Sequence, residues 1–152
     1  MSQTIWVDAD ALPRALKEIL IRCSQRRRPR IVMVANRVMA TLPAPTIEMV
    51  TVKRSADSAD DYIAEQVEAG DLVITADVPL ASRVVAEGAT VLQPRGTTLD
   101  ADNVDTHLSV RNFHDTLRSI GIEGGGPPPL STKHIQSFSN ALDRWVTRRI
   151  NH

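Results

Sequence analysis

The sequence predicts an α/β domain in which a mostly parallel sheet of about five strands is flanked by helices and followed by C-terminal helices. Two observations predict this fold class. Short apolar runs rich in β-branched residues alternate with segments of helical periodicity up to Pro94, and glycine or proline separates many of them. The length of 152 residues suits one domain, so we expect residues 1–152 to share one core.

The expected strands are short and mostly apolar, as in a sheet that is covered on both faces. No strand is expected after Pro94. In chain order, the predicted strands cover residues 4–7, 30–35, 47–52, 71–76 and 89–94.

Helices are predicted between and after these strands from apolar residues at helical spacing. Pro13 suits the first turn of the first helix, and Ser131 suits the cap of the last one. A Gly/Pro-rich linker, residues 121–131, precedes the last helix, which we expect to dock on the same domain. The predicted helices cover residues 13–26, 58–70, 79–88, 101–120 and a segment that starts at Ser131.

The composition excludes several classes of protein. Eighteen basic and eighteen acidic residues leave no net charge, so only a local patch could attract a polyanion. A single cysteine, Cys23, excludes an internal disulfide and a Cys-rich zinc site. The start lacks the pattern of a signal peptide, and no apolar run reaches the length of a membrane span. We expect a cytoplasmic protein without membrane contact; the sequence defines no oligomeric state.

Polar residues follow all five predicted strands. Ligands bind beyond the carboxyl ends of the strands in a parallel α/β sheet, so these residues are expected at one rim. Taken strand by strand, they are Asp8 and Asp10; Asn36 and Arg37; Lys53 and Arg54 with Asp57, Asp60 and Asp61; Thr75 and Asp77; and Arg95.

Several carboxylates at one rim repel one another unless a cation lies among them. Hard divalent ions such as Mg²⁺ or Mn²⁺ take carboxylate oxygens together with waters and substrate phosphate. The basic residues of the same rim would then hold neighbouring phosphates. The pattern indicates a metal-dependent phosphoryl or phosphodiester reaction.

Helix capping is the competing interpretation for each acidic residue. Asp10 lies close before the helix that starts at Pro13, Asp60 and Asp61 lie in the first turn of another, and Asp77 precedes a third. Acidic side chains at these places are favoured by the helix dipole. Only the set of carboxylates therefore points to a site.

The motifs together resemble the YaiI/YqxD family of bacterial proteins over nearly the whole chain. They are "IWVDADALPRALKEIL", "VMVANR", "SADDYIAEQVEAGDLVITADVPLASRVVAEGA", "LQPRG", "RNFHDTLRSIG" and "GGGPPPLSTKHIQSFSNALDRW". The family is grouped with PIN-like domains, the fold of many metal-dependent ribonucleases. The resemblance thus implies a single PIN-like domain and suggests nuclease chemistry.

Residue by residue, the resemblance gives Asp8 the role of the first PIN acidic residue and Asp61, or Asp60 beside it, the role of the second. "TADVPLA" resembles the PIN stretch T-x-D-x-x-L, so Thr75 and Asp77 take those roles. No residue matches the fourth acidic position, which Asp10 could replace in space.

The family motif usually reads "DADACP", and here Leu12 stands in place of the cysteine. A mechanism that needs this thiol does not apply to this chain, whereas a carboxylate–metal mechanism does.

Three functions are open at this point. The first is a Mg²⁺- or Mn²⁺-dependent nuclease or phosphodiesterase that acts on nucleic acid, with RNA favoured over DNA as the substrate. Its metal ligands would come from Asp8, Asp60, Asp61 and Asp77, its catalytic set would include Asp10, and its substrate contacts would be Asn36, Arg37, Thr75 and Arg95.

The second is a PIN-like module that binds nucleic acid or protein without catalysis. The third is a haloacid-dehalogenase-like phosphohydrolase, in which Asp8 is the nucleophile and Asp10 the general acid.

Overall fold

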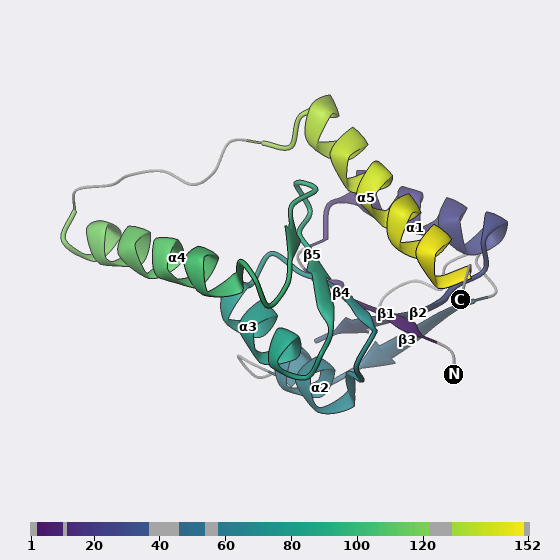
Figure 1. The fold of residues 1–152 in the computed structure, drawn as a ribbon, viewed down its shortest axis with the longest axis horizontal. Coiled ribbons are helices and arrows are strands. Elements are labelled where there is room, and N and C mark those ends of the chain that lie inside the picture. The colour runs from purple at the N-terminus through teal and green to yellow at the C-terminus, as the bar shows by residue number, and fades with distance from the viewer. Residues whose placement is uncertain (1–2, 11, 37–45, 54–57, 122–128, 151–152) are drawn as a thin grey trace.

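A computed structural model describes residues 3–10, 12–36, 46–53, 58–121 and 129–150 (Figure 1). Arg37, Arg54, Asp57 and residues 122–128 of the predicted linker lie outside this part of the chain. In chain order the elements are β1 (Thr4–Asp8), α1 (Arg14–Arg26), β2 (Arg30–Ala35), β3 (Ile47–Thr51), α2 (Ser58–Gln66), β4 (Leu72–Ile74), α3 (Val78–Ala86), β5 (Thr90–Leu92), β6 (Thr98–Leu99), α4 (Val104–Ser119) and α5 (Thr132–Ile150).

The described strands form one sheet in the order β3-β2-β1-β4-β5-β6. The first five are parallel, and β6 pairs antiparallel with β5. The predicted α/β fold with a mostly parallel sheet is confirmed. β1 lies between β2 and β4, so its carboxyl end opens at the middle of the rim.

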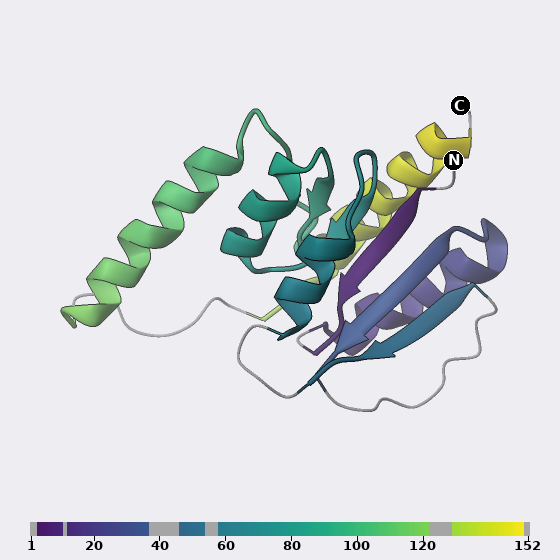
Figure 2. The same ribbon diagram turned by 90° about the horizontal axis from the view of Figure 1, so that it is seen from below.

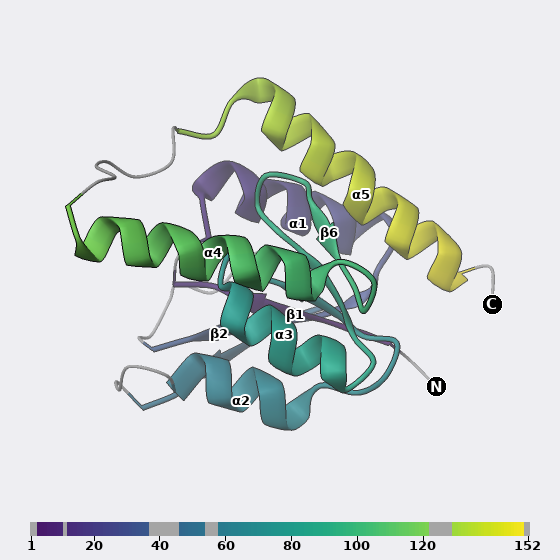
Figure 3. The ribbon, with the colours of Figure 1, turned by 60° about the vertical axis from the view of Figure 1, so that its left-hand side comes forward.

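Helices cover both faces of the sheet, because alternate strand residues point to opposite sides. Ile5 and Val7 face α1 and α5, whereas Trp6 faces α2 and α3. Figure 3 shows α5 beside α1, apart from α2, α3 and α4. Phe138, Leu142 and Val146 bring the last helix into the core of the first face.

The expectation that strands stop at Pro94 is wrong. The chain turns through Gly96, which has a φ of +95°, and returns as the two-residue strand β6. A strand of two residues is too short to show an alternation in the sequence. The turn packs on α5, because a Cβ atom on Gly96 would lie 2.5 Å from Cβ of Ser137.

Several element ends differ from the prediction by one to four residues. The second predicted helix, 58–70, ends at Gln66, since the chain then turns through Gly70 at a φ of +91°. The strands predicted at 71–76 and 89–94 are shorter, spanning Leu72–Ile74 and Thr90–Leu92. Among the described helices, none combines the length and the apolar character that crossing a membrane requires.

α4 extends away from the rest of the molecule, as Figures 1 and 2 both show. Val104, in its first turn, is buried against the core that α2 and α3 cover. Further along, Phe113 and Ile120 are 61% and 62% exposed. The apolar residues that predicted this helix therefore do not form one buried face.

Candidate functional site

Asp8 and Thr75 meet where two neighbouring strands end. β1 and β4 are parallel and pair Val7 with Ile74, so the next residue of each chain segment lies at the same rim. The Thr75 hydroxyl group donates a hydrogen bond of 3.1 Å to Oδ2 of Asp8. Because Thr75 is buried, the sheet itself fixes this contact.

Asp77 continues the same chain of contacts. Its backbone N–H donates to Oγ1 of Thr75 at 3.0 Å, and its Oδ1 accepts a hydrogen bond of 2.9 Å from the backbone N–H of Leu80. Asp77 is thus the N-cap of α3, which confirms for this residue the helix capping that the sequence offered as the alternative to metal binding. The cap leaves Oδ2 available for another partner.

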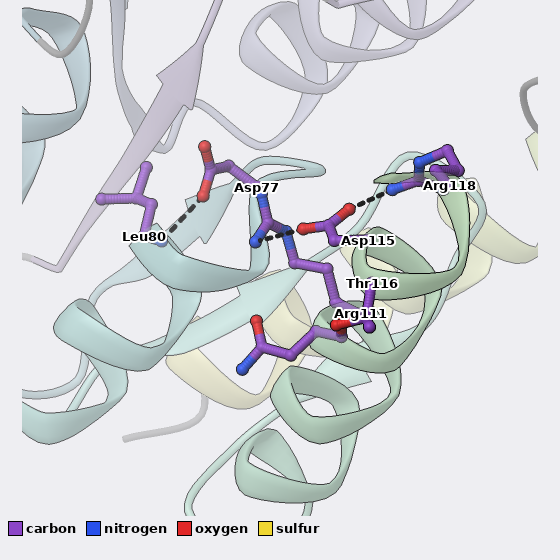
Figure 4. A network of polar contacts seen from close by, with 7 residues as sticks. Asp77, Leu80, Arg111, Asp115, Thr116 and Arg118 are labelled. Atoms are coloured by element: carbon purple, nitrogen blue, oxygen red, sulfur yellow. Dashed lines mark hydrogen bonds and ion pairs between the residues drawn. The ribbon is translucent and has the colours of Figure 1, made fainter. Parts of the chain in front are cut away.

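A cavity of about 330 Å³ opens at this rim. The carboxylates of Asp8 and Asp77 lie on its wall, and Arg111 of α4 contributes a cation. Figure 4 shows the Arg111 side chain reaching from α4 toward Asp77. The residues that line the cavity are Asp8, Leu12, Ile74, Thr75, Ala76, Asp77, Pro94 and Arg111.

The pKa of Asp8 is raised above its ordinary value of 3.8. Burial is the largest cause, and the charges of Asp10 and Asp77 add to it. The hydrogen bond from Thr75 opposes the rise and lowers the pKa in part. Burial and the two neighbouring carboxylates thus disfavour the ionised form of Asp8, and a cation in the cavity would offset both effects.

Asp10 and Asn36 hold the ends of β1 and β2 together. The backbone N–H of Asn36 donates a hydrogen bond of 2.8 Å to Oδ2 of Asp10. Asp10 is exposed, does not line the cavity and does not cap α1, whose N-cap is Pro13 without a side-chain cap. Oδ1 of Asn36 is buried and has no hydrogen-bond partner.

Of the other predicted site residues that the structure describes, Asp60, Asp61 and Arg95 do not line the cavity. Asp61 forms an ion pair of 2.9 Å with Arg83 of α3, and Asp60, half-buried in the same turn, also has an interaction partner. Arg95 lies on the β5–β6 turn, and its Nη1 is 3.2 Å from Nδ1 of His134 on α5. The structure thus brings Asp8, Thr75 and Asp77 together, but not Asp61 or Arg95.

The sequence did not point to Arg111 as part of a site. Arg111 opens the motif "RNFHDTLRSIG" that supports the resemblance, but the resemblance gives this arginine no role. Its place on the cavity wall depends on the packing of α4 on α3 and of Val104 in the core. A helical register that places Arg111 two turns after a buried valine is a further signal.

The sequence also gave no sign of Asp71 as a buried structural carboxylate. Asp71 accepts hydrogen bonds of 2.9 Å from the backbone N–H groups of Thr4 and Glu68 and from Nε1 of Trp6. Thr4 and Trp6 are far from Asp71 along the chain, so no local pattern shows these contacts.

The donor set of the cavity suits a hard divalent ion. In the part of the chain that the structure describes, no group of three or more His, Cys, Asp and Glu residues is arranged to hold a metal. Mg²⁺ is often bound by one or two carboxylates with waters and substrate phosphate, and Asp8 with Asp77 provides such a pair. Asn36, whose Oδ1 is unpaired, does not line the cavity and is not counted in this donor set.

Comparisons with known proteins agree with the resemblance. The family model described as "Uncharacterized BCR, YaiI/YqxD family" matches residues 6–148. A UPF0178 protein of Saccharophagus degradans is 46% identical over 144 residues, which cover 95% of each chain. Those of Shewanella amazonensis and Cellvibrio japonicus are 48% and 46% identical, and each match covers 95% of this chain and 97% of the relative.

Proposed function

The chain belongs to the YaiI/YqxD family, and from this premise we propose that it hydrolyses phosphodiester bonds of nucleic acid with a Mg²⁺ or Mn²⁺ ion held by Asp8 and Asp77. One observation carries the proposal. Two carboxylates share a cavity at the carboxyl end of the central strand, and the pKa of Asp8 is raised by its burial and by two neighbouring negative charges. A divalent cation would offset this cost.

Each carboxylate has one oxygen held by the protein. Oδ2 of Asp8 accepts from Thr75, and Oδ1 of Asp77 accepts from the backbone of Leu80. The remaining oxygens, Oδ1 of Asp8 and Oδ2 of Asp77, are the proposed ligands. Thr75 also fixes the main chain at Asp77, because its hydroxyl group accepts the backbone N–H of Asp77.

When bound, the ion supplies a Lewis acid that neutralises charge on the phosphate and makes a water molecule more acidic. The two carboxylates would hold the ion; Thr75 orients that of Asp8, and the backbone N–H of Leu80 orients that of Asp77. Asp61 is paired with Arg83, and neither Asp60 nor Asp61 lines the cavity, so we assign both a supporting role.

RNA is the proposed substrate because of the resemblance to PIN-like domains. The chain has no net charge, so the attraction of a polyanion must come from charges near the site. Asn36 and Thr75 lie at the rim and are proposed to support substrate binding. Arg37, which lies outside the described residues, and Arg95 remain proposed phosphate contacts.

The phosphohydrolase alternative finds less support. It needs the nucleophile Asp8 and the general acid Asp10 in one cavity, but Asp10 does not line the cavity and its Oδ2 is bound to the backbone of Asn36. Trapping of Asp8 by beryllium fluoride would revive this alternative.

The test is cleavage of labelled RNA and DNA by the purified protein with Mn²⁺. The wild type and Asp143→Asn, an exposed carboxylate paired with Arg27, are expected to cleave, whereas Asp8→Asn is expected to lose nearly all activity. Equal activity of Asp8→Asn and the wild type would refute the proposal. Salt-sensitive binding of RNA without turnover would favour the non-catalytic module instead.

A further inference from the structure

α4 brings a cationic side chain to the cavity that the two carboxylates share. Among the described residues that line this cavity, Arg111 is the only basic one. It belongs to a helix that otherwise extends away from the sheet (Figure 2). Val104 and Arg111 are seven residues apart, so both lie on the same side of α4. The packing of Val104 therefore places Arg111 over the site.

The ion-pair partner of Arg111 lies outside the residues that line the cavity. Nη1 of Arg111 is 3.0 Å from Oδ2 of Asp115, one turn further along α4. Arg118 pairs with the other oxygen of the same carboxylate (Figure 4). Two guanidinium groups thus share one carboxylate, and the cluster keeps a net positive charge.

Arg111 lies on the wall of the cavity together with Asp8 and Asp77. The side chain of Arg111 is 43% exposed, so it can reach an anion that enters from solvent. The cavity therefore presents two carboxylates and, from α4, a cation that is only partly compensated.

We propose that Arg111 binds the substrate phosphate, while Asp8 and Asp77 hold the cation that meets the same phosphate. The identity of this anion as a phosphodiester rests on the proposed function. A guanidinium group offers two parallel N–H donors to phosphate oxygens, so it can fix the orientation of the phosphate as well as attract it. Because Arg118 keeps Asp115 paired, Arg111 can turn to the phosphate without leaving that carboxylate alone.

The direct test is an NMR titration of the full chain with inorganic phosphate, observed at the arginine Nε–Hε groups. Arg118 is the matched control, since it lies on the same helix and shares the same partner but does not line the cavity. We expect the signal of Arg111, assigned by its loss in Arg111→Gln, to shift and that of Arg118 to stay. An equal response of both signals, or none at Arg111, would overturn the inference.

Kinetics with labelled RNA give a second, independent readout. Arg111→Gln is expected to raise KM roughly tenfold or more, Arg111→Lys less, and Arg118→Gln clearly less than Arg111→Gln, because it removes only the second partner of Asp115. An active wild type with the same KM in Arg111→Gln would refute the role of Arg111 and leave the proposed function intact. Phosphate binding at Arg111 in a protein that cleaves no nucleic acid would refute the proposed function and leave the phosphate-binding role of Arg111 intact.

Discussion

The hydroxyl group of Thr75 donates a hydrogen bond of 3.1 Å to the carboxylate of Asp8 and so joins the ends of two neighbouring strands. This is a sparse environment compared with that of Asp71, whose carboxylate accepts three hydrogen bonds near the opposite end of β1. Asp71 is satisfied by the protein and holds the fold. Asp8 is held by one side chain and faces a cavity, as expected for a residue that binds something else.

Asp8→Asn is expected to stabilise the metal-free protein at neutral pH. The folded-state pKa of Asp8 is raised, so the native state binds more protons than the unfolded state between pH 3.8 and that pKa. The ionised carboxylate therefore costs stability at higher pH, and this cost disappears as the pH falls toward 3.8. Melting temperatures of the wild type and the variant in EDTA should differ at pH 7 and converge on acidification.

A variant that melts below the wild type at pH 7, or a difference that does not change with pH, would contradict this account of Asp8. Thr75→Val is the companion variant. It removes the one interaction that lowers the pKa of Asp8. The melting temperature of Thr75→Val should therefore fall more between pH 4 and pH 7 than that of the wild type.

Asp71→Ala is expected to destabilise the fold by about 3 to 5 kcal/mol. The substitution leaves three buried or partly buried N–H donors without their acceptor, including Nε1 of Trp6. Urea denaturation followed by tryptophan fluorescence measures the change. Asp143→Ala, which removes an exposed ion pair with Arg27, should cost less than about 1 kcal/mol. Similar costs for both variants would show that Asp71 is not a structural carboxylate.

The two phenylalanines should differ sharply in their contribution to stability. Phe138 of α5 is fully buried between the helix and the sheet, so Phe138→Ala should cost about 3 to 5 kcal/mol. Phe113 of α4 is 61% exposed, and Phe113→Ala should change the free energy of unfolding by less than about 0.5 kcal/mol. A large loss at Phe113 in dilute, monomeric protein would mean that α4 packs on the domain more closely than in this structure.

Gly96→Ala should destabilise the protein more than Gly121→Ala. Both glycines have positive φ angles, +95° and +80°, so alanine strains the backbone at either place by about 1 kcal/mol. Only at Gly96 would the new Cβ atom meet α5, 2.5 Å from Cβ of Ser137, which raises the expected cost to about 2 to 4 kcal/mol. Equal melting temperatures of the two variants would exclude this close approach.

Much of the fold follows from local patterns in the sequence. The five parallel strands are mostly apolar runs, and the helices between them show their period within a few turns. β6 could not be predicted, because its two residues gain their conformation from pairing with Val91 and Leu92. The exposure of apolar residues on α4 could not be predicted either. A helical period of apolar residues predicts a helix, but it does not show which other element covers them.

The candidate site could be predicted only where its residues follow strands. Asp8 ends β1, and Thr75 and Asp77 follow β4, so the pairing of the two strands brings them together. Arg111 reaches the cavity from a helix much later in the chain, which depends on tertiary packing. Asp61 was expected among the ligands, but its position on α2 also lies within reach of Arg83.

The claim that Asp8 and Asp77 bind a divalent ion is tested most directly by a crystal soaked in Mn²⁺ and measured for anomalous scattering. The account predicts one ion in the cavity, within about 2.5 Å of Oδ1 of Asp8 and Oδ2 of Asp77, and no ion there in Asp8→Asn. Crystals of the wild type with an open cavity and bound Mn²⁺ only elsewhere, or with none, would contradict it.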